Sequence, residues 1–178
     1  FHSYFFFFFV YTVDKLLSIL TIIGIPLVVF AFTLLFMRKG PLRLFHKEVA
    51  KNGLWLAFII AIIATLGSLF YSEIAGYNPC KLCWLQRIFM YPLSIILLVA
   101  AIRKDRKVFS YVLPMTIIGG GIALGHYLLQ LSQYTGVCVA DAIDCAQSYV
   151  FYAGFVSIPL MALVAFVLIS AFVLLARK

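Results

Sequence analysis

Apolar residues run along this chain in five long stretches that are separated by short polar segments. A helix needs about 20 predominantly apolar residues to cross the hydrocarbon of a bilayer. The aromatic segment Tyr4–Tyr11, which precedes the first stretch, is typical of an interfacial extension of a tilted span. The pattern therefore predicts five spanning helices, approximately over Leu16–Met37, Leu54–Tyr71, Trp84–Ile102, Val108–Leu131 and Tyr149–Ala176.

The composition also indicates an integral membrane protein. The 178 residues are 65% hydrophobic and 11% charged, whereas a soluble domain is about 45–50% apolar and about 25% charged. A net charge of +8 alone would be compatible with a nucleic-acid partner. The basic residues, however, cluster in two short connections and at the C-terminal end, which is the pattern of membrane topology. We therefore expect membrane lipid around the protein and no nucleic acid.

The distribution of charge predicts an orientation. The first and third connections are rich in lysine and arginine, and the two connections that hold the four cysteines are not. Basic connections remain in the cytoplasm under the positive-inside rule. We therefore expect a multi-pass protein of the bacterial cytoplasmic (inner) membrane, with its N-terminus outside and its C-terminus in the cytoplasm. All four cysteines would lie on the periplasmic or extracellular side.

The segment Asn78-Pro79-Cys80 carries the first candidate chemistry. Asn is a preferred N-cap and Pro is preferred at the first helical position, so this segment predicts a helix that begins at Pro79. Cys80 would then lie in the first turn, where unpaired N–H groups and the helix dipole stabilise a thiolate. Cys83 and Arg87 follow on the same helical face. The pattern indicates a redox-active cysteine pair with a cation beside it, at the edge of the bilayer.

The other two cysteines, Cys138 and Cys145, form a second pair in the second external connection. Two inert disulfides would be compatible with an oxidising compartment, and C-x-x-C is also half of a four-cysteine zinc site. A bridge within C-x-x-C, however, closes a very small loop, and its usual use is thiol–disulfide exchange. The second pair also lacks the tight spacing of metal ligands. We therefore favour two exchanging pairs and expect no metal.

Two exchanging pairs on one membrane face suggest an electron relay. A soluble dithiol protein would reduce the loop pair, the loop pair would reduce the membrane-edge pair, and the electrons would then need a lipid-soluble acceptor. The sequence has no C-x-x-C-H haem motif, no nucleotide-binding fingerprint and no segment long enough for a flavin domain. We therefore expect a membrane quinone as the acceptor.

Polar residues within two predicted spans mark a site at the same edge of the membrane. Arg87 lies one turn below Cys83, and His126 and Gln130 are spaced i,i+4 on the fourth span. Ionisable groups inside a membrane are functional candidates by default. The structural alternatives are a packed interior histidine at His126 and an arginine at 87 that only snorkels to the interface. We predict that Arg87 and His126 hold the two carbonyl oxygens of a quinone, with Gln130 beside them.

Several of these residues carry a resemblance to a known family. The segment Pro79-Cys80-Lys81-Leu82-Cys83-Trp84-Leu85-Gln86-Arg87 resembles the signature of the DsbB/BdbC disulfide bond formation proteins, as do His126-Tyr127-Leu128-Leu129-Gln130 and the cysteine pair that follows. The resemblance covers approximately Leu54 to Ala176. It implies an all-α integral membrane fold, a four-transmembrane-helix bundle to which this chain adds one N-terminal transmembrane helix. We therefore divide the chain into 1–53, the extra span with its basic loop, and 54–178, the DsbB-like redox domain.

The resemblance also implies an activity and roles for the cysteines. The protein would be a thiol:quinone oxidoreductase that re-oxidises a thioredoxin-like dithiol oxidase of the DsbA/BdbD type, passes electrons to ubiquinone or menaquinone, and so supports disulfide bond formation. Cys138 would form the mixed disulfide with the oxidase, and Cys145 would exchange with Cys80. Cys83 would be the thiolate that engages the quinone. The loop pair is closely spaced, as in the BdbC type, and we expect the extra first span to pack peripherally.

Two alternatives remain open at this point. A vitamin K epoxide reductase-like protein performs similar quinone-linked thiol chemistry, but its C-x-x-C follows the loop pair, whereas here it comes first. A non-enzymatic membrane scaffold or transporter subunit, held by two disulfides, is an alternative of another class. Catalytic reduction of a quinone would separate the enzyme from the scaffold.

Overall fold

The computed structural model describes residues 2–36, 43–132, 145 and 149–177. Over these residues it contains five long helices: α1 (His2–Phe36), α2 (Arg43–Leu69), α3 (Lys81–Arg103), α4 (Phe109–Ser132) and α5 (Ile158–Ala176). A π-helical turn, η1 (Phe70–Ile74), extends α2, and a short 3₁₀ turn, η2 (Arg106–Val108), precedes α4. All five long helices are long and apolar enough to cross a membrane. The predicted all-α membrane architecture is confirmed.

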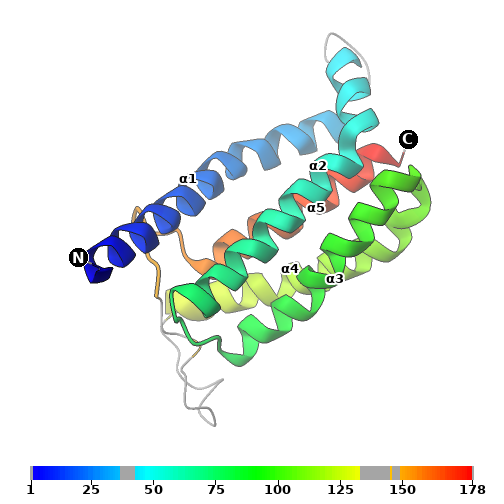
Figure 1. The fold of residues 1–178 in the computed structure, drawn as a ribbon. Helices are drawn as coiled ribbons and strands as arrows, with labels where there is room; N and C mark the ends of the chain where they lie inside the picture. Colours follow the sequence, from blue (N-terminus) through cyan, green and yellow to red (C-terminus); the bar gives the residue numbers. More distant parts are fainter. Residues whose placement is uncertain (1, 37–42, 133–144, 146–148, 178) are drawn as a thin grey trace.

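The helices lie side by side in an elongated bundle, and α5 runs through its interior (Figure 1). Helix α5 packs against α1, α2 and α4, while α3 packs against α2 and α4. No charged residue occurs between Ile158 and Ala176, and a helix that is apolar all round is suited to burial. Its side chains Phe166, Ile169 and Leu175 are at most 1% exposed. The core of the bundle is therefore built around α5.

Helix α5 begins later than the apolar stretch predicted. The predicted span starts at Tyr149, but residues 149–157 form a connecting segment that contains the isolated bridge between Tyr152 and Val156. Ala153 and Gly154 in this segment have φ values of 53° and 79°, which an α-helix does not accommodate. Pro159 lies in the first turn of α5, where proline is preferred. Local backbone geometry, rather than hydropathy, sets this boundary.

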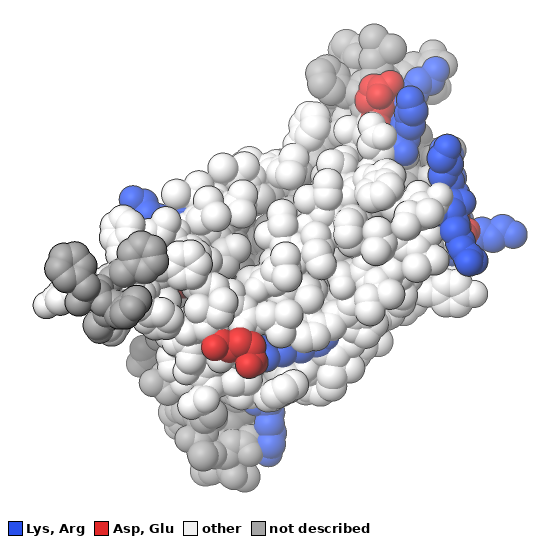
Figure 2. Space-filling model, in the orientation of Figure 1, with Lys and Arg blue, Asp and Glu red and all other residues white. Residues whose placement is uncertain are grey.

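Basic side chains gather at one end of the bundle, where α2 begins, α3 turns into α4 and the chain ends (Figure 2). The described lysines and arginines of these segments are Lys47, Lys51, Arg103, Lys104, Arg106, Lys107 and Arg177. The start of α3, which carries the first cysteine pair, lies at the opposite end (Figure 1). The cysteine pair and the basic connections are thus separated by the length of the bundle.

Candidate functional site: a cysteine pair at the mouth of a membrane cavity

Cys80 is the N-cap of α3. Its backbone is extended, with φ −72° and ψ 172°, and its carbonyl accepts the Trp84 N–H at 3.1 Å. The sequence had predicted a helix that begins at Pro79 with Cys80 inside its first turn, so the predicted start is wrong by two residues. The extended backbone of Cys80 is the reason, because only the residues after an N-cap have helical dihedrals. The side chain of Cys80 still lies beside the N-terminal end of the helix.

The cysteines of the C-x-x-C motif are a closely spaced pair of free thiols. The Sγ atoms of Cys80 and Cys83 are 3.3 Å apart, within hydrogen-bond distance. Cys145 is 2% exposed and lies in one small apolar cluster with Cys80, Leu82 and Cys83. Cys145 is disulfide-bonded. The structure therefore brings a residue of the loop pair, in its oxidised form, against the dithiol of the membrane-edge pair, whereas Cys138 lies outside the described residues.

His126 joins the two cysteine pairs. Its ring is 2% exposed, and its Nε2 lies 3.0 Å from the carbonyl oxygen of Cys145 and 3.8 Å from Cys80 Sγ. Nδ1 lies 3.1 Å from Gln86 Nε2. A carbonyl only accepts hydrogen bonds, so Nε2 carries the proton that is donated to Cys145. Nδ1 of the neutral ring is then free to accept from the Gln86 amide.

Sequence reasoning did not single out Gln86 as a functional residue, although it lies within the C-x-x-C segment. Its side chain is 6% exposed and is placed on the inner face of α3, towards α4. The available signal was an amide within an apolar span, because such amides form hydrogen bonds between membrane helices. Gln86 fixes the ring orientation of His126.

These contacts change the acidity of Cys80. The hydrogen bond with Cys83 has the largest effect and lowers the pKa of the Cys80 thiol, against the opposing effect of burial, and His126 lowers it further. The pKa of Cys80 is therefore held well below its usual range. A thiolate at this position is both a nucleophile and a good leaving group in disulfide exchange.

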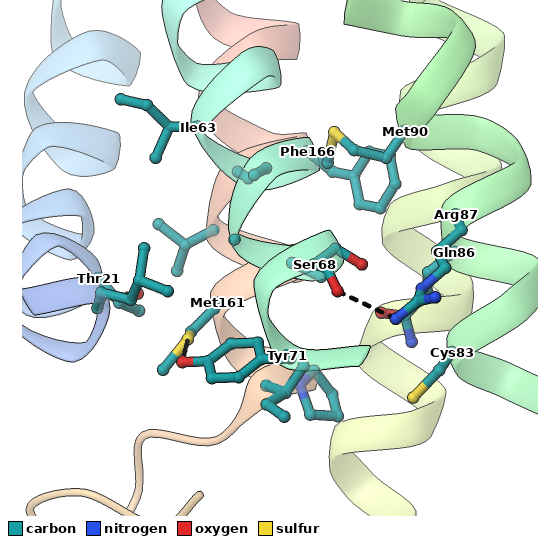
Figure 3. A pocket seen from close by; sticks show the side chains of 18 of the residues that line it. Thr21, Ile63, Ser68, Tyr71, Cys83, Gln86, Arg87, Met90, Met161 and Phe166 are labelled. Carbon is teal, nitrogen blue, oxygen red and sulfur yellow. Dashed lines mark hydrogen bonds between the residues drawn. The ribbon is translucent and has the colours of Figure 1, made fainter. Parts of the chain in front are cut away.

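A cavity of about 310 Å³ opens directly beside the pair. Residues of all five long helices line it, and the close-up shows Cys83 and Arg87 on its α3 side (Figure 3). Ligand pockets are typically apolar, with a small number of placed polar groups. The lining is largely apolar, and it includes a group of polar and sulfur-bearing residues near the cysteine pair: Ser68, Cys80, Cys83, Gln86, Arg87, His126 and Gln130.

Arg87 is tied to the wall of this cavity. Its Nη2 donates to the carbonyl oxygen of Ser68 at 3.1 Å, drawn as the dashed line in Figure 3, and its guanidinium lies 5.3 Å from the ring centroid of Trp84. Ser68 is the second-to-last residue of α2, and the π-helical turn η1 follows directly after that helix. Such turns change the pattern of backbone hydrogen bonds and occur frequently at functional sites. Arg87 bridges α3 to this irregular end of α2.

The geometry also bears on a metal site. The ligand atoms of Cys80, Cys83 and His126 lie within 4.8 Å of one another, and thiolate with imidazole is a donor set that suits zinc. The four-cysteine zinc site considered from the sequence would also need Cys145 as a thiolate, but Cys145 is disulfide-bonded in this state. The described residues thus bring together a dithiol, a disulfide-bonded cysteine and a histidine.

A dithiol of one buried and one partly buried cysteine, a disulfide-bonded cysteine packed against it and a bundle of membrane-spanning helices define a membrane thiol oxidoreductase. Comparison with known proteins supports this class of protein. The family model described as "Disulfide bond formation protein DsbB" matches residues 50–176. The chain therefore belongs to the DsbB family of disulfide bond formation proteins, and its function is disulfide bond formation at a membrane.

Relatives with curated descriptions support this assignment. The chain is 46% identical over 127 residues to "Disulfide bond formation protein C" of Bacillus subtilis (strain 168), and the alignment covers 70% of this chain and 91% of that protein. It is 47% identical over 135 residues to "Probable disulfide formation protein" of Oceanobacillus iheyensis, covering 72% and 91%. It is 41% identical over 137 residues to "Probable disulfide formation protein C 1" of Bacillus anthracis, covering 75% and 99%. No solved structure matches the chain.

Proposed function

We propose that the protein is a thiol:quinone oxidoreductase. It re-oxidises a thioredoxin-like dithiol oxidase outside the bacterial cytoplasmic membrane and passes the electrons to ubiquinone or menaquinone. The observation that carries the proposal is the position of the C-x-x-C pair, with Cys80 packed against disulfide-bonded Cys145 and Cys83 on the wall of an apolar cavity. This pair has access to protein thiols on one side and to a lipid-soluble acceptor on the other.

The cavity fits a quinone in chemical character. A quinone has a flat ring with two carbonyl oxygens, which need donors, and an apolar tail, which needs an apolar channel. The guanidinium of Arg87 and the amide of Gln130 are donors within the group of polar residues near the cysteine pair, and the remaining lining is largely aliphatic. A bound quinone supplies an acceptor for two electrons and two protons.

The exchange steps assign a role to each cysteine. The dithiol of the partner oxidase reduces the Cys138–Cys145 disulfide through a mixed disulfide at Cys138. In the oxidised form of the protein, in which Cys80 and Cys83 are joined by a disulfide, the thiolate of Cys145 then attacks Cys80, and Cys83 leaves as a thiolate. Cys138 next attacks Cys145, which re-forms the loop disulfide and releases Cys80. The partner has then lost two electrons, and the Cys80–Cys83 pair holds them as a dithiol.

The electrostatics of the site favour this order. Release of Cys80 from Cys145 is assisted because the contact with His126, and the hydrogen bond with Cys83 once Cys83 has taken up a proton, hold the pKa of Cys80 low. A thiol of lower pKa leaves faster. His126 also binds the backbone carbonyl of Cys145, which keeps the two sulfur-bearing residues adjacent. In the neutral dithiol state both ring nitrogens of His126 are engaged by protein groups. The predicted contact between His126 and a quinone oxygen therefore stays a prediction, and Arg87 is the stronger candidate for that contact.

The proposal includes an orientation. The basic connections would lie in the cytoplasm and the start of α3 outside, because positively charged connections remain on the cytoplasmic side. Figure 2 shows a cluster of basic side chains at the end of the bundle that this assignment places in the cytoplasm, with only scattered basic side chains elsewhere on the visible face. A cysteine-labelling reagent that does not cross membranes should modify Cys80 and Cys83 when it is added outside intact cells. It should not modify them when it has access only to the cytoplasmic side.

The decisive experiment is turnover. The detergent-purified protein is mixed with a reduced thioredoxin-like dithiol protein and a soluble quinone, and loss of quinone absorbance is followed. We expect catalytic reduction that is lost in Cys83→Ser and kept in Ser94→Ala, a control at a buried polar residue of the same helix. Absence of turnover by the folded wild-type protein with both benzoquinones and naphthoquinones would support the scaffold alternative instead.

A further inference from the structure

Helix α1 lies outside the part of the chain that is shared with the family. The family model begins at residue 50. The aligned region already covers 91% of the Bacillus subtilis relative and 99% of the Bacillus anthracis relative. The remainder of either relative is shorter than the 20 or so residues that one spanning helix needs. In comparison with these relatives, this chain has an additional helix.

This additional helix forms one wall of the cavity that holds the cysteine pair. The residues of α1 that line it are Leu17, Leu20, Thr21, Ile23, Gly24 and Leu27, and they face lining residues of α2 that include Ile60, Ile63, Ala64 and Gly67. The close-up shows Thr21 and Ile63 on opposite sides of the space between the two helices (Figure 3). The cavity therefore extends from Arg87 along α3 into an apolar groove between α1 and α2.

Close contacts hold α1 in place on both sides of the groove. A Cβ atom added at Gly24 would lie 2.8 Å from Val164 Cγ1 of α5, and one added at Gly67 of α2 would lie 3.3 Å from Leu17 Cδ1. Glycine at these two positions therefore permits a close approach of helices, as small residues do in membranes. At the same end, the Tyr77 hydroxyl donates to Asp14 Oδ2 of α1 at 3.5 Å.

We propose that the groove between α1 and α2 binds the isoprenoid tail of the quinone whose ring lies beside Cys83 and Arg87. This inference rests on the proposed function. The groove and the polar residues near the cysteine pair belong to one cavity, so a ring held at Arg87 has an apolar path for its tail towards Thr21 and Ile63. Helix α1, which we expected to pack peripherally, thereby becomes a specificity-determining element for tailed quinones.

The expected contribution of the tail is moderate. Lipid chains are as apolar as the groove, so moving the tail from lipid into the groove brings no hydrophobic gain. The gain comes from packing and from a restricted orientation of the ring. Filling the groove acts differently, because it excludes the tail sterically. We expect a bulky side chain in the groove to weaken binding of a tailed quinone about tenfold, which corresponds to about 1.4 kcal/mol.

The test compares two quinones and two variants of α1. Thr21→Phe fills the groove, while Val29→Phe adds a similar volume at a position that is 61% exposed and does not line the cavity. Equilibrium binding is measured in detergent for a quinone with a long isoprenoid tail and for the same ring without a tail. We expect Thr21→Phe to weaken only the tailed quinone, and Val29→Phe to change neither. Equal affinities of both variants for the tailed quinone would overturn the proposal.

A second measurement uses the wild-type protein and does not depend on the folding of a variant. A quinone that carries a diazirine in its tail is photo-crosslinked, and the modified peptides are identified by mass spectrometry. Crosslinks to α1 that are lost with excess tailed quinone support the proposal. Crosslinks to α3 and α4 alone would overturn it, and competition by phospholipid instead of quinone would show that the groove holds a lipid chain. Failure of the tail-less ring to bind at all would count against the proposed function rather than against the groove alone.

Discussion

Gln86→Leu is the substitution that most directly tests how the site is built. Gln86 is 6% exposed, and its Nε2 lies 3.1 Å from His126 Nδ1. Leucine has a similar size but no hydrogen-bonding group, so the substitution leaves a buried ring nitrogen without its partner. Loss of one partner of a buried hydrogen bond costs about 1–3 kcal/mol. In a chain of this length, each kcal/mol lowers Tm by about 2–4 °C.

The same substitution should change the acidity of Cys80. His126 is a secondary cause of the lowered pKa of Cys80, after the hydrogen bond from Cys83, and Gln86 orients its ring. We therefore expect Gln86→Leu to raise the pKa of Cys80 by about 1, equivalent to about 1.4 kcal/mol. A higher pKa leaves less thiolate at any pH between the old value and the new one. At a pH well above both values, the wild type and the variant should react equally.

Site-resolved alkylation measures this effect. The reduced protein is treated briefly with iodoacetamide across a pH series, and mass spectrometry reports the modified fraction of each cysteine. The midpoint for Cys80 should move to higher pH in Gln86→Leu and stay in place in Ser94→Ala. The control removes a buried hydroxyl that donates to the Tyr91 carbonyl on the same helix. An unchanged Cys80 midpoint, with a lowered Tm, would mean that Gln86 is only structural and would refute the positioning role.

Two further predictions concern Arg87 and the contact between α4 and α5. Arg87→Ala should raise the quinone KM about tenfold while both disulfides still form, because the Arg87 guanidinium lies on the cavity wall beside Ser68. Stopped-flow measurement of quinone reduction checks this expectation. An unchanged KM would mean that Arg87 is not a quinone contact. Gly119→Ala should lower Tm, because the added Cβ would lie 2.5 Å from the buried ring of Phe166 and overpacking costs about 1–3 kcal/mol. Gly121→Ala, where nothing lies within 4 Å of the added atom, should leave Tm unchanged or raise it; equal Tm values for the two variants would contradict the packing argument.

The spans were predictable because a membrane imposes one dominant requirement on every segment that crosses it. Apolar length alone located all five helices, and the polar residues Arg87, His126 and Gln130 stood out because such residues are rare in spans. Helix ends were less predictable. The starts of α3 and α5 depend on the dihedral angles of Cys80 and of Ala153 and Gly154, and hydropathy contains no information about dihedral angles.

Gln86 shows why the interior of the site was harder to predict than its cysteines. A C-x-x-C pair has chemistry that follows from its spacing, whereas the role of Gln86 depends on a contact with His126, which lies 40 residues later in the chain. The same holds for α1, whose apolar sequence resembles any other span. Because α1 lies beside α2 and α5, its residues form one wall of the cavity that holds the cysteine pair. In both cases the function arises from which helices become neighbours, and helix packing in membranes is decided by local fit at small residues such as Gly24 and Gly67.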